Sequence, residues 1–556
     1  MDSFLVRQVV SELSRELPGA LVSKVHQPSA RDLVLVLWTG RADRLLLLSA
    51  DPALCRIHLV ARKPHNPQTP LRFCRYLRRH LEGMRIERFD LAPFDRSVRI
   101  DFASTRTDAL HARTSLYAEL FGRHANLIYV DGDGTILEPL RAVPTEESAI
   151  REVAAGVPYR PLPKPARIFL PEFSLEDAES VLAAGRLEGA GRALQRVVTG
   201  LGRELADEAA AAGGDDPAGL LRAVRDLSRR YESGESRPCI GMPPSGKARL
   251  LPFPCPAAGF VSFESFPSAN EAADRFFGGV TAERDAATLR QQIASRLGTL
   301  LRKARHTLEK VEGDEARLRE GLAGGAHGET LKYALGQIRK GMTDFQGVPL
   351  DPSKSPVENM ERYFRLAKKA KGAAGIVRNR LRDLSEEVFY LESLEAQLAE
   401  AETIEALMAI RQELTESISA KGHGGSQKAK PKTVKAKPAA PLVPQVERID
   451  FRGWTLFVGR NNVGNDRIVR ELASPDDLWL HAQGIPGSHV LVKRPAGAEV
   501  PAEVIEEAAR LAVLHSKARG SSNVPVFLAA ARDVSKFKGA KPGLVRIASY
   551  TTINVR

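Results

Sequence analysis

Two charged segments with a helical spacing of apolar residues constrain the fold of this 556-residue chain more than any other feature. In residues 280–320 the apolar positions are Leu297, Leu300, Ala304, Leu308, Val311 and Leu318. In residues 378–415 they are Leu381, Leu384, Val388, Leu391 and Leu398. Because roughly sixty residues separate the two arms, an antiparallel coiled-coil hairpin over 281–420 is the simplest structure that buries both seams. Dimerisation through one arm is the alternative.

The segment between the arms is expected at the tip of this hairpin. Residues 350–371 read LDPSKSPVENMERYFRLAKKAK. We expect them to form a helix of their own with a basic end. Residues 421–445 follow the second arm and predict a flexible linker, because they combine Gly, Ala and Pro with many lysines and no acid. These lysines are Lys421, Lys428, Lys430, Lys432, Lys435 and Lys437.

Residues 1–150 alternate helix and strand patterns, which predicts an α+β lobe. Helices are expected at 3–16 and 73–81. Strands are expected at 33–38, 44–50, 55–60, 98–103 and 126–131, the last turning at Gly132-Asp133-Gly134. Residues 446–556 predict a mixed α/β domain, with strands at 454–459, 489–493, 524–529 and 543–548 and a helix near 502–518.

Residues 151–280 predict Ala- and Gly-rich helices broken by Pro. Within them, RALQRVVTGLGRELADEAA (192–210) contains two helical runs that meet at Gly200-Leu201-Gly202. A helix–GLG–helix unit places backbone N–H groups and a helix N-terminus against a phosphate, as helix-hairpin-helix modules do. The alternative is that these glycines only end a helix.

The charge of the chain favours a polyanionic partner. The formal net charge is +13 and the isoelectric point about 9.6. Neutralising phosphates releases counterions, so nucleic acid is the expected partner. Cys55, Cys74, Cys239 and Cys255 form no CxxC pair or zinc spacing; a bridge between the last two is conceivable, but a reducing cytosol is the simpler interpretation. The N-terminus is not a signal peptide and no stretch is long enough to span a bilayer, so we expect a cytoplasmic protein without cofactor, metal or membrane partner.

Basic surfaces predict where nucleic acid binds. In the first lobe, Asp95 and Arg96 in FDRSVRIDF combine an acceptor with a planar fork for phosphate, although a plain salt bridge is the simpler alternative. Arg75, Arg78, Arg79 and Arg85 fall near one helical face and form a candidate phosphate track. From residue 511 onward, Asp533 alone opposes eight basic residues. They are Lys517, Arg519, Arg532, Lys536, Lys538, Lys541, Arg546 and Arg556.

The C-terminal domain contains the stretch of sequence that most resembles an active site. His481, Ser488 and His489 lie around an expected turn in DLWLHAQGIPGSHVLVK, but neighbouring strand residues point to opposite faces, so Ser488 and His489 are not expected to form a nucleophile–base pair. An RNA-contacting loop or a structural turn is favoured over hydrolysis. GRNNVGND (459–466) lacks the ending of a Walker A loop. Its Asn461, Asn462 and Asp466 are candidate RNA contacts or turn residues.

These segments, in this order, resemble the NFACT family. The matching text includes KVHQP (24–28), SADPALCRIHL (49–59), FCRYLRRHLEG (73–83), FDR (94–96) and ELFGRHANLI (119–128). It continues with LDPSKSPVENMERYF (350–364), GRNNVGND (459–466), DLWLHAQGIPGSHV (477–490) and KGAKPGLV (538–545). The resemblance covers essentially the whole chain. It implies a glycosylase-like N-terminal lobe, a helix-hairpin-helix region, the coiled-coil hairpin and an RNA-binding C-terminal domain.

The resemblance also implies a factor of ribosome-associated quality control. Such proteins bind a large ribosomal subunit blocked by peptidyl-tRNA and recruit charged tRNA, alanyl-tRNA in bacteria, so that the stalled chain receives a C-terminal tail that marks it for degradation. Other quality-control factors are possible partners, and a monomer on the ribosome is expected. The ribosome forms the peptide bonds, so no catalytic residue is required. The family's functional positions fall on Asp2, Asp95 and Arg96, and Arg123 lies in the matching FGRHAN.

Two departures concern the details of tRNA choice. Ser3 stands where many relatives have Gly, and FGRHAN replaces the commoner MGxxSN at 121–126. Two other classes of function remain as alternatives: an adhesin of the extracellular matrix, since family members have carried the fibronectin name, and a nucleic-acid processing enzyme. No export signal supports the first, and Met1-Asp2 offers no N-terminal nucleophile for the second.

Overall fold

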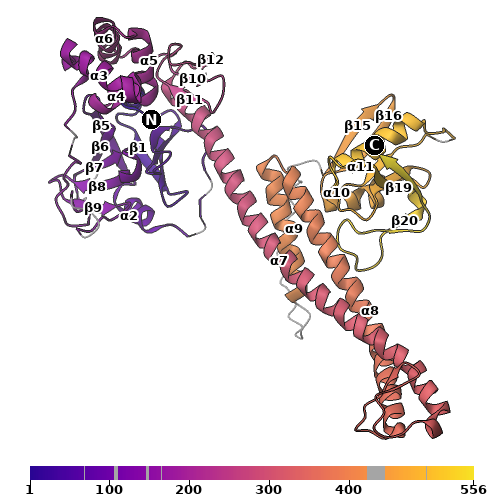
Figure 1. Cartoon of the computed structure of the whole chain (residues 1–556). Helices are drawn as coiled ribbons and strands as arrows, with labels where there is room; N and C mark the ends of the chain where they lie inside the picture. Colours follow the sequence, from indigo (N-terminus) through magenta and orange to yellow (C-terminus); the bar gives the residue numbers. More distant parts are fainter. Residues whose placement is uncertain are drawn as a thin grey trace. The chain divides into compact units, whose positions relative to one another are not determined.

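The protein is a mixed α/β chain of more than one domain, as the sequence predicts. The computed structural model describes residues 1–555 except 65, 68, 106–110, 146–149, 164–165, 423–444 and 496. Two compact units comprise Met1–Thr281 and Ala282–Arg556 (Figure 1). The lysines expected in the linker after Lys421 lie outside the described residues, as does Arg556.

A nine-stranded antiparallel sheet forms the base of the first unit, in the order β4-β3-β2-β1-β5-β6-β7-β8-β9. The strands are β1 Leu21–His26, β2 Asp32–Trp38, β3 Asp43–Ser49, β4 Arg56–Leu59, β5 Met84–Leu91, β6 Ser97–Ser104, β7 Arg113–Glu119, β8 Asn126–Asp131 and β9 Ile136–Pro139. The five strands expected from sequence are present as β2, β3, β4, β6 and β8. The other four were missed, because polar and charged residues such as Lys24, Arg85 and Ser115 interrupt the apolar pattern of β1, β5 and β7, and β9 is only four residues long.

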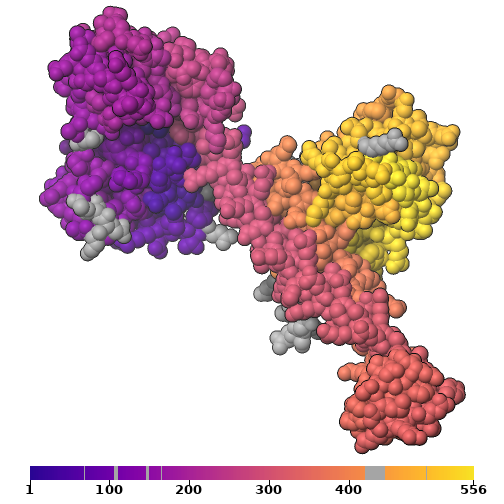
Figure 2. Space-filling view, viewed as in Figure 1, coloured from indigo at the N-terminus to yellow at the C-terminus, as the bar shows by residue number. Residues whose placement is uncertain are grey.

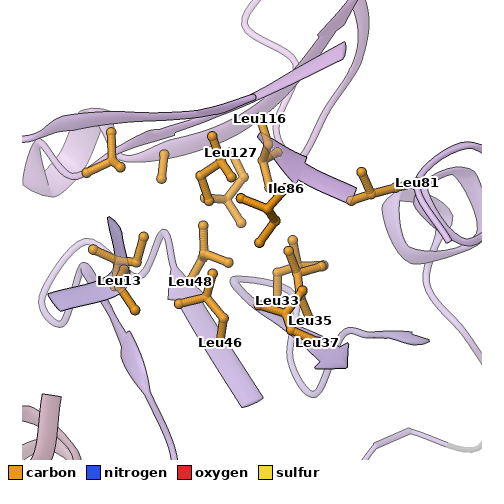
Figure 3. Close-up of a cluster of buried hydrophobic side chains, with 14 of the residues drawn as sticks. Leu13, Leu33, Leu35, Leu37, Leu46, Leu48, Leu81, Ile86, Leu116 and Leu127 are labelled. Atoms are coloured by element: carbon orange, nitrogen blue, oxygen red, sulfur yellow. The ribbon is translucent and has the colours of Figure 1, made fainter. Parts of the chain in front are cut away.

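Two helices bury the apolar face of this sheet. Helix α1 (Ser3–Glu16) places Val6, Val9 and Leu13 in the core, and α2 (Arg72–His80) contributes Phe73, Cys74 and Leu77. Figure 3 shows the leucines of β2 and β3 facing those of β7 and β8, with Leu13 of α1 at one side of the same cluster. Each fully buried leucine of this kind stabilises the fold by about 1.5–3 kcal/mol.

A small helical domain completes the first unit. Its helices are α3 Leu175–Glu188, α4 Ala190–Val197, α5 Arg203–Gly213 and α6 Pro217–Ser233. A three-stranded sheet, β10 Cys239–Met242, β11 Arg249–Leu251 and β12 Ser262–Ser265, was not expected from sequence. Phe4 and Phe94 of the first lobe belong to the core of this domain, so the two parts share one interior. All four cysteines are free and buried, so the conceivable bridge between Cys239 and Cys255 is not formed.

A hairpin of long helices begins the second unit. Helix α7 (Ala269–Tyr333) runs out and α8 (Pro356–Glu400) returns antiparallel to it (Figure 1). Arg290 contacts Ala401, Arg305 pairs with Glu392 at 2.5 Å, and Gly328 faces Phe364, so residue numbers fall on α8 as they rise on α7. The two expected seams therefore meet within one chain.

The second arm differs from the sequence expectation at both ends. The predicted continuous helix over 378–415 breaks after Glu400, and α9 (Ile404–Gly422) turns back to pack Leu407, Ile410 and Leu414 into the same core. The helix expected at 350–371 is not separate, because Pro356 begins α8 itself with a capping box from Ser355 and Glu358. The tip instead consists of short elements between α7 and α8, including strands β13 Asp344–Phe345 and β14 Val348–Pro349, gathered in a compact knob (Figure 2).

The C-terminal domain contains a six-stranded sheet in the order β15-β16-β18-β17-β19-β22. Its strands are β15 Val446–Phe451, β16 Trp454–Gly459, β17 Leu478–Ala482, β18 Val490–Val492, β19 Val524–Ala530 and β22 Thr551–Val555. Helix α11 (Ala502–Leu514) covers one face, and α10 (Asn462–Arg467) with a π-helical turn at Ile468–Leu472 covers the other. The strand expected at 543–548 is reduced to β21 (Arg546–Ile547), which pairs with β20 (Val534–Ser535) outside the main sheet.

Replacing Leu394 tests the core of the helical hairpin. Leu394 of α8 is fully buried between α7 and α9. We expect Leu394→Ala to lower the free energy of opening of α8 by about 2–5 kcal/mol, because it removes buried surface and leaves a cavity. Amide hydrogen exchange of α8 peptides measures this change. Met408→Ala, at a position 43% exposed on α9, is the control and should have little effect; equal exchange in both variants would contradict the assigned core.

Candidate nucleic-acid interface

Three segments far apart in sequence meet at one place in the first unit: the N-terminus, the FDR loop and the GLG turn. Asp2 caps α1, with its Oδ1 accepting a hydrogen bond of 2.9 Å from the N–H of Leu5. Ser3 donates its hydroxyl to the carbonyl of Gly200 at 2.5 Å. Phe94 adopts a φ of 57°, uncommon for a side chain of this size, and stacks on Tyr231 with ring centroids 3.9 Å apart. The meeting point is therefore held by hydrogen bonds between side chains and backbone and by ring stacking.

The GLG turn needs both of its glycines. Gly200 has a φ of +75°, and a Cβ there would lie 2.3 Å from the carbonyl oxygen of Phe94. A Cβ on Gly202 would lie 2.8 Å from Oδ2 of Asp2. The first neighbour is a backbone atom, and a Cβ on Gly202 would also lie 2.9 Å from Cβ of Asp2, which cannot turn away as a carboxylate can. The turn thus approaches the FDR loop and the N-terminus as closely as only glycine allows.

These segments line a pocket of about 350 Å³. Its charged side chains are Asp2, Arg96, Arg167, Arg192 and Arg196, and Gln195 and the GLG backbone complete the wall. Arg196 also pairs with Glu188 at 2.6 Å. Helix α5 begins here, and its N-cap Gly202 supplies no side-chain hydrogen bond to the first turn. Four arginines and an uncapped helix N-terminus make the pocket suited to an anion such as phosphate.

Asp2 and Asp95 have different roles at this site. Burial raises the pKa of the Asp2 carboxyl, and the N–H of Leu5, the N-terminal charge and Arg96 act against that rise. Asp95 accepts hydrogen bonds at Oδ1 from the N–H groups of Arg96 at 2.6 Å and Ser97 at 3.3 Å. Asp95 therefore shapes the loop that presents Arg96. The Arg96 guanidinium carbon lies 5.5 Å from the centre of the Phe121 ring, within reach of a cation–π interaction.

The predicted arginine track is only partly formed. Arg75 and Arg79 are exposed on α2, whereas Arg78 is half-buried and donates to the carbonyl of Val25 at 2.9 Å. Placing Arg85 on the helix was wrong, because it lies on β5 and donates to the carbonyl of Gly19 at 2.7 Å. Arg123 lines a second pocket of about 350 Å³ together with Arg141 and Arg151, apart from the residues of the first pocket.

The polar residues of GRNNVGND make contacts inside the second unit. Asn461 caps α10 by accepting from the N–H of Gly464 at 2.7 Å. Asn462 is 2% exposed and donates to Ser393 and Glu413 on α8 and α9, both at 2.9 Å. Asp466 pairs with Lys536 and accepts from the N–H of Gly543 at 2.9 Å. This geometry does not favour direct contact of these three side chains with RNA.

His481, Ser488 and His489 lie in the interior of the C-terminal domain. Each is less than one tenth exposed. The two imidazoles pack edge to face at 5.2 Å, and both contact the ring of Trp479. Burial lowers the pKa of His481 to about 4 and that of His489 well below its usual range. With Trp479, the two neutral imidazoles form a buried aromatic layer, whereas the sequence predicted a structural turn or an RNA-contacting loop here.

The basic residues after position 511 are partly neutralised by acids from elsewhere in the chain. Lys517 lies 3.2 Å from Glu395, and Arg532 lies 2.8 Å from Asp476. Lys541 stands 5.0 Å from the centre of the Tyr390 ring. Arg519, Lys538 and Arg546 are exposed, and Arg546 lies over Phe537. Counting only Asp533 against the eight basic residues therefore overestimated the positive charge that is free of acidic partners.

Sequence reasoning missed the arginines that line the first pocket. Arg192 and Arg196 stand at positions i and i+4 of α4, immediately before the GLG turn, and Arg167 precedes the helical domain. The spacing of the first two along one helix face was a readable signal. Arg167 carries no such signal, because only the tertiary fold brings it to the pocket.

A pH prediction follows from the buried histidines. His481 keeps a low pKa in the fold and regains about 6.5 when unfolded, so the unfolded chain binds a proton that the folded domain does not. Stability should fall as the pH drops from about 6.5 to about 4, by roughly 3 kcal/mol for His481 alone. Amide exchange of β17 and β18 across this range measures the loss. His481→Phe keeps a ring without a proton to gain, so it should reduce the slope, and the remaining slope comes from His489; an unchanged slope would contradict this origin.

Within the described residues, no helix is long and apolar enough to cross a membrane, and no cluster of His, Cys, Asp and Glu is arranged to hold a metal ion.

Comparison with known proteins agrees with the family resemblance along the whole chain. Residues 2–433 match the NFACT N-terminal and middle domains, and residues 449–549 match the NFACT protein RNA binding domain. The chain is 30% identical over 573 residues to "Rqc2 homolog RqcH" of Bacillus subtilis strain 168, covering 100% of this chain and 97% of that protein. It is 28% identical over 568 residues to "Rqc2 homolog RqcH" of Streptococcus pneumoniae strain D39, with the same coverage.

A solved structure of the N-terminal part of the fibronectin/fibrinogen-binding protein from Streptococcus suis is also similar, with 25% identity and a TM-score of 0.42. It covers 50% of this chain and 99% of that chain. Since one family model spans residues 2–433 and a second spans most of the remainder, this chain belongs to the NFACT family.

Proposed function

We propose that this protein is a ribosome-associated quality control factor that binds obstructed large ribosomal subunits and recruits tRNA to them. The chain is similar to relatives named RqcH over 97% of their length, and it includes the family's RNA-binding domain. The net charge of +13 suits a partner rich in phosphate.

The first pocket is the observation that carries the tRNA part of this proposal. Asp2, Arg96 and the GLG turn, identified separately in the sequence, line the same cavity. The α4–GLG–α5 unit serves as a helix-hairpin-helix module, whose uncapped α5 N-terminus and flanking Arg192 and Arg196 hold a phosphate. Arg96 adds a planar fork that binds phosphate in two places or stacks on a base. Asp2 supplies an acceptor for an amino group or a 2′-hydroxyl.

The remaining parts of the chain have binding roles in this proposal. The tip of the α7–α8 hairpin contacts the ribosome, and the C-terminal domain binds RNA through exposed basic residues such as Arg519 and Lys538. The recruited tRNA is alanyl-tRNA, and the stalled chain receives an alanine tail that marks it for degradation. The factor acts as a monomer in the cytoplasm.

The factor itself performs no catalysis, because the ribosome forms the peptide bonds. The most enzyme-like side chains, His481, Ser488 and His489, are buried in a packed layer away from solvent. Neither an adhesin nor a nucleic-acid processing enzyme is supported by a specific feature of the described residues.

Replacing Arg96 tests the tRNA site. We expect Arg96→Ala to weaken tRNA binding by about 1–3 kcal/mol, because the pocket loses its fork for phosphate or base. Arg96→Lys keeps the charge and should restore only part of the affinity. The measurement is the affinity for labelled tRNA, with ribosomal subunit binding followed by co-sedimentation.

The control for this test is Arg229→Ala, which removes an exposed charge from α6 in the same unit. Its tRNA affinity should match that of the unmodified protein. A pocket without a role in tRNA binding would give the same affinity for Arg96→Ala and Arg229→Ala.

Ser488→Ala tests the proposal that the factor has no hydrolytic or transfer chemistry of its own. The backbone N–H of Ser488 donates to the carbonyl of His515 at 2.9 Å, a contact that Ala retains. We expect alanine-tail synthesis on obstructed subunits to proceed at nearly the normal rate. Loss of tailing in a variant that still folds and binds the subunit would show that Ser488 has a chemical role.

A further inference from the structure

The C-terminal domain is held against α8 and α9 by a buried polar network. The Asn462 amide donates to Ser393 of α8 and to Glu413 of α9, and the Tyr390 hydroxyl donates to Glu413 at 3.1 Å. All four side chains are less than one tenth exposed. Hydrogen bonds, rather than apolar packing, thus form the centre of this contact.

Opposite charges surround the network. Lys517 lies 3.2 Å from Glu395 and 3.9 Å from Glu392, both on α8. His515 lies 3.1 Å from Glu400, and the Lys541 ammonium faces the ring of Tyr390. Lys517 and His515 of the C-terminal domain therefore face carboxylates of α8, which are negative groups that a phosphate of a nucleic acid can replace.

The contact has the composition of a reversible interface. The hydrophobic core of α7, α8 and α9 and the two cores of the C-terminal domain share no side chain among the described residues. Burial raises the pKa of Glu413 to about 6, so holding this carboxylate in the contact has an energetic cost. Exposed ion pairs such as Lys517–Glu395 contribute little stability each. Interfaces within a chain that lack a large apolar area permit domains to separate.

We propose that this docking is autoinhibitory: side chains of α8 engage Lys517, His515 and Lys541, and RNA phosphates compete with α8 for these groups, so RNA binding releases the C-terminal domain from the helices. The inference rests on the proposed RNA-binding function of this domain. In this inference Glu395 and Glu400 compete with RNA phosphates for the basic groups of the C-terminal domain. Asn462 makes the contact that sets the docked position.

The test removes negative charge from the docking face without adding a group that binds RNA. Glu395→Gln with Glu400→Gln is made in the full chain. Its control is Glu309→Gln with Glu312→Gln, two exposed positions on α7, which changes the net charge by the same amount. Each protein is titrated against a labelled 20-nucleotide oligouridylate at several salt concentrations, and affinity is read by fluorescence anisotropy.

We expect the docking variant to bind the oligonucleotide about three- to tenfold more tightly than the control, since two weak competing pairs are lost. Its salt dependence should steepen by about 0.7 for each lysine that newly contacts phosphate. Lys517→Ala should reduce the affinity more in the docking variant than in the unmodified protein. That difference measures the coupling between docking and RNA binding.

The outcomes separate the inference from the function on which it rests. If the unmodified protein and both variants bind the oligonucleotide equally, and Lys517→Ala has the same effect in each, the docking is permanent and the inference is overturned, while the RNA-binding function stands. If neither the unmodified protein nor the docking variant binds the oligonucleotide even at low salt, the proposed RNA-binding function itself fails.

Discussion

The first unit depends on one close approach of backbone to backbone, where Gly200 meets Phe94. A turn between two helices of the helical domain is pressed against a loop of the sheet lobe, and the absence of a side chain at Gly200 is the condition for that contact. The left-handed φ of Phe94 and its stacking on Tyr231 hold the loop in place. The contact joins two regions that share one core, so the loop that carries Arg96 is anchored in the packed interior through Phe94.

Strands with long apolar runs were predicted correctly from the sequence, whereas amphipathic strands were missed. β2 and β3, with DLVLVLW and DRLLLLS, are buried on both faces over much of their length. β5, with MRIERFDL, is buried only at alternate positions, and its charged outward residues resemble a loop. The break between α8 and α9 was missed for another reason: the apolar spacing continues across it, and only the packing of α9 back onto the same core reveals two helices.

The candidate sites show a similar division. Asp2, Arg96 and the GLG turn were recognised separately, but their convergence depends on the fold. In the C-terminal domain, polar residues were recognised in the sequence, but their buried environment was not predicted. Asn462 and Asp466 looked like surface groups because Asn and Asp are usually exposed, yet their partners Glu413 and Lys536 lie 49 and 70 residues away in sequence. A local count of charges cannot detect acids that tertiary structure brings to a basic segment.

The burial of all four cysteines bears on how the protein tolerates oxidants. A thiol reacts as its thiolate, so both accessibility and acidity decide its rate of oxidation. Burial raises the pKa of Cys74 and Cys255, and brings that of Cys239 to about 11. These sulfurs are therefore withheld from peroxide by position and by protonation together. Oxidation of Cys74, Cys239 and Cys255 therefore requires the surrounding structure to open first, so the rate of damage by peroxide follows the opening of the fold.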